Sequence, residues 1–150
     1  MSYVSLLYHI VLRTKRSVPA ISESHERELY LYILMFVRSR DCVLHRIGGM
    51  PDHIHLLVSA RPTICLSDFM RDLKTATSKF LKANRNTMFP LFDGWESEYY
   101  ASTVSKENKD SVKQYIMNQK EHHKVTSFRD EFLRLCKENG IEVDERYLPE

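Results

Sequence analysis

The sequence predicts a single α+β domain over residues 1–150, in which a four-stranded antiparallel sheet carries helices on one face and further helices follow. Three observations predict this class. The chain has 150 residues, a length typical of one domain with its own core. Hydrophobic residues make up 43% and charged residues 28%, which is the balance of a folded rather than a disordered protein. Segments with strand-type and helix-type spacing of apolar residues alternate along the chain.

The first half of the chain is expected to form a strand, a helix and a hairpin of two strands. Residues 4–14 are rich in β-branched and aromatic side chains, which favours a strand. Ser22 is a suitable N-cap for a helix that ends near Arg40. Residues 42–47 and 54–58 are short apolar runs, and the Gly-Gly-Met-Pro-Asp segment between them has the composition of a turn. We therefore expect a hairpin whose loop is that segment.

The second half adds a long helix, a fourth strand and two more helices. Apolar residues recur at helical spacing over residues 66–84, followed by an expected strand at residues 99–104. Residues 107–123 and 128–138 are expected to be helical, and the second of these helices should stop at Asn139-Gly140. The order β-α-β-β-α-β is the split βαβ arrangement of ferredoxin-like domains.

Charge, cysteine content and hydropathy narrow the classes of function. The net charge of +2 neither requires nor excludes a polyanionic partner, so any basic surface must be local. Cys42, Cys65 and Cys136 stand far apart, which suits reduced packing residues better than a disulfide or zinc framework. The first twelve residues lack the features of a secretion signal, and no apolar run approaches the roughly 20 residues of a membrane span. We expect a soluble cytoplasmic protein without a membrane partner.

The most specific local feature is the segment Pro-Asp-His-Ile-His, in which His53 and His55 stand two residues apart. In a strand, residues at this spacing project from the same face, so two imidazoles would offer half of a divalent-metal site. Taken alone, the pair is equally typical of ordinary core or surface histidines. A histidine-triad hydrolase would require a third histidine where Leu57 stands, and a two-histidine phosphodiesterase would require His-x-Ser/Thr motifs, so both alternatives are disfavoured.

A second feature is the pair Tyr115 and Gln119, four residues apart on an expected helix. Residues at this spacing are neighbours on one helix face, so a phenol and an amide would share a patch. By itself the pair is more typical of a half-buried tyrosine beside a solvated glutamine. It gains meaning only in combination with the histidines.

A third feature lies on the polar side of the helix at residues 66–84, where cations recur at helical spacing without a carboxylate among them. They are Arg71, Lys74, Lys82 and Arg85, together with Ser78. A charged outer face is normal for an amphipathic helix, but an excess of cations on that face favours contact with phosphate groups. We call these four cations the basic ridge.

Together these features resemble the single-tyrosine HUH transposases of small insertion sequences and of REP elements, in which an apolar residue separates two histidines. His53-Ile54-His55 has that pattern. Other matching segments occur in the same order: Tyr8-His9-Ile10-Val11, Arg13-Thr14-Lys15, residues 50–58, Leu73-Lys74, Thr77-Ser78, residues 100–105 and Asp144-Glu145-Arg146-Tyr147-Leu148. One departure is Thr75-Ala76, where that family is expected to have a glycine.

The resemblance implies a ferredoxin-like fold and a metal-dependent transposase activity on single-stranded DNA. By this likeness His53, His55 and Gln119 would bind Mg²⁺ or Mn²⁺, and Tyr115 would be the nucleophile that forms a 5′-phosphotyrosine and releases a 3′-hydroxyl. It further implies recognition of DNA hairpins, for which the basic ridge is the candidate, and a homodimer with shared active sites. No nucleotide cofactor is expected, because the phosphotyrosine bond is itself available for rejoining.

Two other functions stay open at this stage. The first is a domesticated protein of the same fold that binds DNA hairpins and no longer transposes. The second is initiation of rolling-circle replication or conjugation, which uses similar histidines and a tyrosine in longer chains. An intact set of His53, His55, Tyr115 and Gln119 argues against the first, and the short chain argues against the second.

Overall fold

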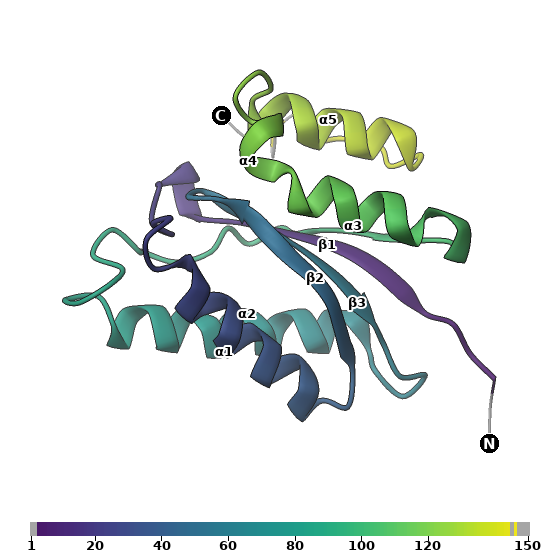
Figure 1. The fold of residues 1–150 in the computed structure, drawn as a ribbon, viewed down its shortest axis with the longest axis horizontal. Coiled ribbons are helices and arrows are strands. Elements are labelled where there is room, and N and C mark those ends of the chain that lie inside the picture. Colours follow the sequence, from purple (N-terminus) through teal and green to yellow (C-terminus); the bar gives the residue numbers. More distant parts are fainter. Residues whose placement is uncertain (1–2, 145, 147–150) are drawn as a thin grey trace.

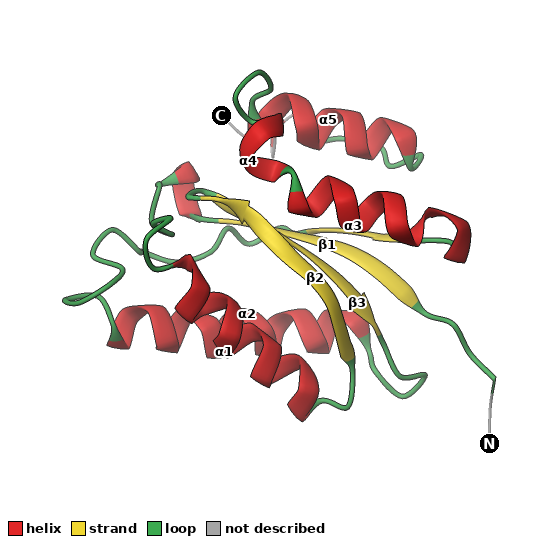
Figure 2. Ribbon diagram, in the orientation of Figure 1, coloured by secondary structure: helices red, strands yellow, loops and turns green. Residues whose placement is uncertain are grey.

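The computed structural model describes residues 3–144 and 146 and has the expected α+β architecture (Figures 1 and 2). The strands are β1 (Leu7–Arg13), β2 (Val43–Met50), β3 (His53–Ser59) and β4 (Tyr100–Thr103). The helices are α1 (Glu26–Ser39), α2 (Leu66–Ala83), α3 (Lys109–Met117), α4 (Gln119–His122) and α5 (Phe128–Glu138). None of the described helices is long and apolar enough to cross a bilayer.

The sheet has the order β2-β3-β1-β4, and every neighbouring pair is antiparallel. This order confirms the ferredoxin-like prediction. Helices α1 and α2 cover one face, and α3, α4 and α5 lie over the other (Figure 1). The C-terminal helices therefore bring the tyrosine segment to the face that the first two helices leave free.

Strand β3 divides its side chains between the two faces. Ile54, Leu56 and Val58 belong to the main hydrophobic core with α1 and α2. The alternate residues His53, His55 and Leu57 point to the other face, where Leu57 packs with Leu7 and Ile116 of α3. The two-residue period of a strand thus places both histidines under the C-terminal helices.

The hairpin between β2 and β3 is tighter than the sequence predicted. Only Pro51 and Asp52 form the turn, and Gly48 and Gly49 belong to β2. The expected five-residue loop is therefore wrong. The glycines serve close packing rather than the turn, because a Cβ on Gly48 would lie 2.6 Å from the carbonyl oxygen of Ile116 in α3.

The helix boundaries differ from expectation in two places. Helix α1 begins at Glu26 behind His25 rather than at a Ser22 cap. The single helix expected over residues 107–123 is divided into α3 and α4 at Asn118, a residue type that is poor inside helices. Helix α5 agrees with the prediction and stops before Gly140, whose φ of 66° suits glycine.

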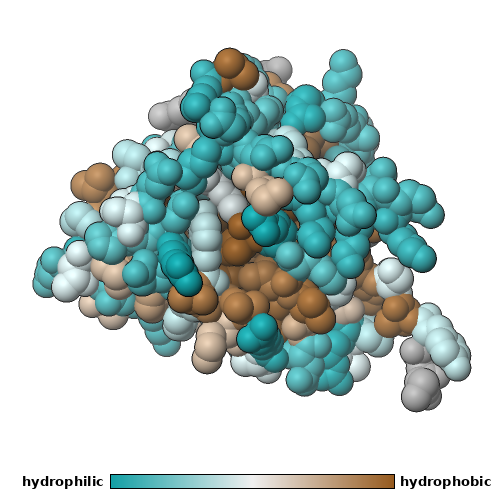
Figure 3. Space-filling model, viewed as in Figure 1, coloured by the Kyte–Doolittle hydropathy of each residue, from teal (hydrophilic) through white to brown (hydrophobic). Residues whose placement is uncertain are grey.

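Hydrophobic side chains also gather on the surface where α1 approaches the edge strand β2 (Figure 3). A hollow of about 250 Å³ there includes Tyr30, Leu31, Leu34, Leu44 and Ile47 among its lining residues. Half of the Leu31 surface is exposed. Apolar side chains at the β2 edge of the sheet are therefore partly in contact with solvent.

Replacement of Gly49 by alanine is expected to destabilise the fold by about 1–3 kcal/mol, the range typical of overpacking. A Cβ at this position would overlap the carbonyl oxygen of His53, so backbone rather than a flexible side chain would have to move. Urea denaturation would measure the loss. Val43→Ala on the exposed start of the same strand is the control, with a change within about 1 kcal/mol. Equal stability of Gly49→Ala and the wild type would contradict this packing argument.

Candidate active site

The histidine pair on β3 is fixed by hydrogen bonds at the ring atoms that face away from the site. His53 Nδ1 lies 2.8 Å from Asp52 Oδ1, and His55 Nδ1 lies 2.8 Å from Nε2 of His9 on the neighbouring strand β1. Both β3 histidines are fully buried. With Nδ1 engaged in each ring, both Nε2 atoms turn towards the C-terminal helices, and each lies near the same carboxylate.

The structure brings Tyr115 and Gln119 to these histidines. Gln119 is buried at the start of α4, and its Oε1 lies 3.2 Å from His53 Nε2. Tyr115, near the end of α3, stacks edge-on against His55. All four residues singled out in the sequence therefore meet in one cluster. They come from a single chain here, and a homodimer with shared sites stays a prediction.

At the centre of the cluster is Glu131 of α5, which the sequence analysis missed. Its carboxylate is completely buried, with Oε1 3.0 Å from His55 Nε2 and 3.3 Å from His53 Nε2. Its Oε2 accepts hydrogen bonds from Gln119 Nε2 at 3.1 Å and from the Tyr115 hydroxyl. A signal was available in the sequence, because Glu131 falls in phase with Phe128 and Leu135 on the apolar side of its helix.

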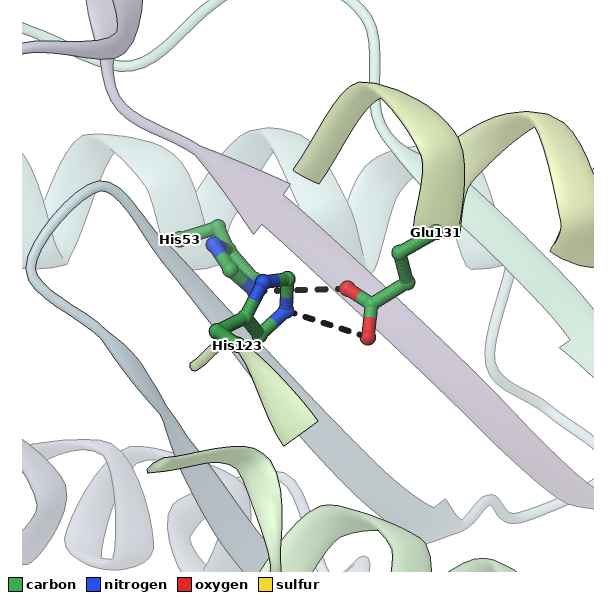
Figure 4. A group of neighbouring side chains, drawn as sticks. All are labelled: His53, His123 and Glu131. Carbon is green, nitrogen blue, oxygen red and sulfur yellow. Dashed lines mark ion pairs between the residues drawn. The ribbon is translucent and has the colours of Figure 1, made fainter. Parts of the chain in front are cut away.

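Two further histidines, the adjacent His122 and His123, also face this carboxylate. Their Nε2 atoms lie 3.3 Å and 3.2 Å from Glu131 Oε2. Figure 4 shows the imidazoles of His53 and His123 beside the two oxygens of Glu131. Four imidazoles therefore surround one buried carboxylate.

The electrostatics of the cluster depend on this carboxylate. Burial alone raises the pKa of Glu131, but its contacts with His123, His53 and His55 hold that pKa well below the ordinary value. Burial lowers the pKa of His55 to about 4. Burial also opposes a charge on His53, yet its contacts with Asp52 and Glu131 raise its pKa to about 9.

Tyr115 is not activated by its protein neighbours alone. Burial and the charge of Glu131 raise the pKa of the Tyr115 hydroxyl above its usual value of about 10. The same oxygen accepts a hydrogen bond of 3.1 Å from Arg134 Nη2, which only partly offsets this effect. The phenol is therefore protonated in the metal-free protein.

The donor atoms of this cluster fit a divalent metal ion. Imidazole nitrogens, an amide oxygen and a carboxylate oxygen are established metal ligands. One ligand atom from each of His53, His123 and Glu131 lies within 4.8 Å of the others. In addition, the buried Nε2 of His123 makes no hydrogen bond among the described residues. The residues present are thus compatible with the metal that the sequence resemblance implies.

The basic ridge on α2 is more engaged in intramolecular contacts than its sequence pattern suggested. Arg71 pairs with Asp68 at 3.3 Å and with Asp72 at 3.2 Å, so the expectation of a ridge free of carboxylates is wrong at this end. Asp68 lies three residues before Arg71 and is therefore its neighbour on the helix surface, and the long arginine side chain also reaches the adjacent Asp72.

Lys74 and Lys82 of the ridge border a groove beside the loop that precedes β4. Lys74 donates to the carbonyl oxygens of Glu96 and Ser97, and Arg85 donates to that of Phe92. A groove of about 410 Å³ is lined by Lys74, Thr75, Ser78, Lys79, Lys82, Gly94 and Trp95. This surface lies on α2, on the opposite side of the sheet from the histidine cluster (Figure 1).

Comparison with known proteins assigns the family. Residues 2–119 match the sequence model of the family described as "Transposase IS200 like". The chain belongs to this family. The matched range contains His53, His55, Tyr115 and Gln119. It ends before His122, His123 and Glu131. Glu145, Tyr147 and Leu148, which contributed to the sequence resemblance, lie outside the described residues.

Individual relatives agree with this assignment. The ISDra2 transposase TnpA of Deinococcus radiodurans is 36% identical over 73 residues, which are 47% of this chain and about half, 52%, of that protein. A crystal structure of a candidate transposase from D. radiodurans R1 is 28% identical, with a TM-score of 0.62 over 79% of this chain and 95% of that one.

A third similar structure supports the fold. It is the REP-associated tyrosine transposase bound to a REP hairpin, with a TM-score of 0.57 over 82% of this chain and 72% of that chain. At 16% identity, this likeness establishes a shared architecture for the IS200-like family member and no more.

Proposed function

We propose that this member of the IS200-like family is a metal-dependent transposase that cuts and rejoins single-stranded DNA through Tyr115. The observation that carries the proposal is the convergence of the Tyr115 hydroxyl with His53 Nε2, His55 Nε2 and Gln119 Oε1 around one buried point. A phenol beside a candidate metal site is an arrangement that can support phosphoryl transfer to tyrosine.

In this proposal His53, His55 and Gln119 hold the divalent metal ion, Mg²⁺ or Mn²⁺. When bound, that ion supplies a Lewis acid that polarises the scissile phosphate and favours ionisation of the nearby phenol. The Tyr115 hydroxyl gives up its proton to solvent, its oxygen attacks phosphorus and forms a new O–P bond, and the bond to the 3′-oxygen of the neighbouring nucleotide breaks. The departing 3′-oxygen takes up a proton and becomes a hydroxyl, and the 5′-phosphate stays on Tyr115.

The protein groups around Tyr115 hold its oxygen in place before attack. Glu131 accepts the hydrogen bond from the hydroxyl, and Arg134 donates to the same oxygen. Attack of another 3′-hydroxyl on the phosphotyrosine reverses the step and joins two strands. Because the bond to Tyr115 keeps the phosphoryl group reactive, no nucleotide cofactor is required.

We further infer that the substrate contains DNA hairpins and that the basic ridge contacts their phosphates. The structural neighbour bound to a REP hairpin and the cations along the groove on α2 support this view. The ridge lies across the sheet from Tyr115, but Lys74 contacts the loop that leads into the edge strand β4. DNA that binds the ridge would therefore pass around the β4 edge to reach the site.

Replacement of Lys82 by alanine is expected to reduce hairpin affinity and the salt dependence of binding. The slope of log K against log [salt] should decrease in magnitude by about 0.9, which is the effect of one lost phosphate contact. Fluorescence anisotropy with a labelled hairpin at several KCl concentrations would measure both. Arg38→Ala, which removes an exposed cation from α1, is the control and should leave the slope unchanged. An unchanged slope for Lys82→Ala would exclude this lysine from the interface.

The direct test of the proposed function is covalent capture of DNA. The purified protein is mixed with labelled single-stranded hairpins and Mn²⁺, and a denaturing gel reports any protein–DNA adduct. An adduct supports a transposase. Binding of hairpins without an adduct, across metals and flanking sequences, would favour a domesticated hairpin-binding protein of the same fold.

A further inference from the structure

The starting observation is a buried negative charge whose ion pairs all come from histidines. Glu131 is 0% exposed. Among the described residues its ion-pair partners are His53, His55, His122 and His123, none of which carries a permanent charge. A buried carboxylate requires a compensating cation, from a proton or from a metal ion.

The hydrogen bonds of His123 show which ring atom is available. Its Nδ1 lies 2.7 Å from the carbonyl oxygen of Thr126, which can only accept, so Nδ1 carries the proton. Nε2 is then the ring nitrogen that can bind a metal ion, and it lies 3.2 Å from Glu131 Oε2 without a hydrogen bond. The side chain is only 5% exposed, so solvent has little access to this nitrogen.

His53 is oriented in the same way. Its Nδ1 faces the Asp52 carboxylate, so Nε2 is the ring nitrogen directed at Glu131 Oε1 and Gln119 Oε1. Potential ligand atoms from three segments thus point towards one another. A cation among these atoms stabilises the arrangement.

The spacing of these atoms agrees with ligands of one ion. Two ligands at right angles, each about 2.1 Å from a metal, lie about 3.0 Å apart. Glu131 Oε1 is 3.0 Å from His55 Nε2 and 3.3 Å from His53 Nε2, and Gln119 Oε1 is 3.2 Å from His53 Nε2.

We propose that Glu131 and His123 complete the ligand set of the divalent metal ion, a proposal that rests on the metal-dependent site of the proposed function. The histidine pair of β3 and Gln119 then supply three ligands, and α5 with the segment before it supplies two. On a six-coordinate ion, one position is left for an oxygen of the scissile phosphate. The carboxylate also lowers the net charge of the centre from two to one.

The test is a Mn²⁺ titration of the metal-free full-length protein, followed by the electron paramagnetic resonance signal of free Mn²⁺. Glu131→Gln, which keeps the shape of the side chain and removes its charge, is expected to weaken Mn²⁺ binding at least about tenfold. His123→Gln is expected to weaken it as well. Glu138→Gln, on an exposed position of the same helix, is the control and should bind within about twofold of the wild type.

The outcomes separate this inference from the proposed function. If His53→Ala loses Mn²⁺ binding while Glu131→Gln and His123→Gln bind as the wild type does, the extended ligand set is wrong and the simpler metal site stands. If the wild type binds no Mn²⁺, both proposals fail. Thermal melts of the metal-free variants identify any loss of Mn²⁺ binding that comes from unfolding. If Glu131→Gln does not fold, the Mn²⁺ affinity of His123→Gln tests the extended ligand set.

Discussion

Replacement of Tyr115 by phenylalanine is expected to abolish covalent attachment of DNA while leaving hairpin binding nearly unchanged. The variant lacks the oxygen to which the proposed function assigns the bond to phosphorus, so capture should fall by on the order of 10⁴-fold or more. The phenyl ring keeps its contacts with His55 and His9, which preserves the packing of α3. Loss of the hydrogen bonds with Glu131 and Arg134 should cost about 1–3 kcal/mol of stability. Adduct formation on a denaturing gel and anisotropy binding measure the two effects.

A matched control is Tyr32→Phe, because Tyr32 lies on α1 and stacks on Phe80 at the other face of the sheet. This variant should form the adduct at the wild-type level. Equal loss of binding and capture in folded Tyr115→Phe would remove Tyr115 as the nucleophile. Tyr99 and Tyr100 would then be replaced next.

Metal removal is expected to have an effect of similar size. EDTA should stop cleavage of single-stranded DNA, and Mn²⁺ or Mg²⁺ should restore it, because the pKa of Tyr115 is raised in the metal-free site. The His53→Gln variant should cleave at least about 100-fold more slowly than the wild type at the Mn²⁺ concentration that restores wild-type cleavage. Cleavage rates across a Mn²⁺ titration measure both effects.

His45→Gln is the corresponding control, since His45 lies on the edge strand β2 and contacts Ser59 rather than the cluster. It should respond to Mn²⁺ as the wild type does. Undiminished cutting by metal-free protein would exclude the β3 histidines from a metal-dependent mechanism.

Much of the fold followed from periodicity. The alternation of strand and helix patterns predicted the sheet, and the two-residue spacing of His53 and His55 predicted their common face. The length of the hairpin loop could not be predicted from the sequence. Glycine is typical of turns, and only the contact with Ile116 shows that Gly48 is a packing residue of the strand. That contact joins segments far apart in the sequence.

The candidate site was predictable only in part. The four-residue spacing of Tyr115 and Gln119 placed them near each other, although the helix breaks between them at Asn118. Glu131 was missed because a glutamate in an amphipathic helix is normally solvated, and its burial depends on how α5 docks on the sheet. The partners of Arg71 and Lys74 were unpredictable for a similar reason, since long side chains select among several nearby acceptors.

The alternation of side chains along β3 has a consequence for how mutations in this strand can be classified. Ile54, Leu56 and Val58 belong to the main core, while His53 and His55 face the reactive cluster. Selection for folding and selection for chemistry therefore act on interleaved positions of the same seven residues. A library of substitutions across residues 53–56 should separate into two phenotypes with a period of two, one defined by loss of soluble protein and the other by abundant but inert protein.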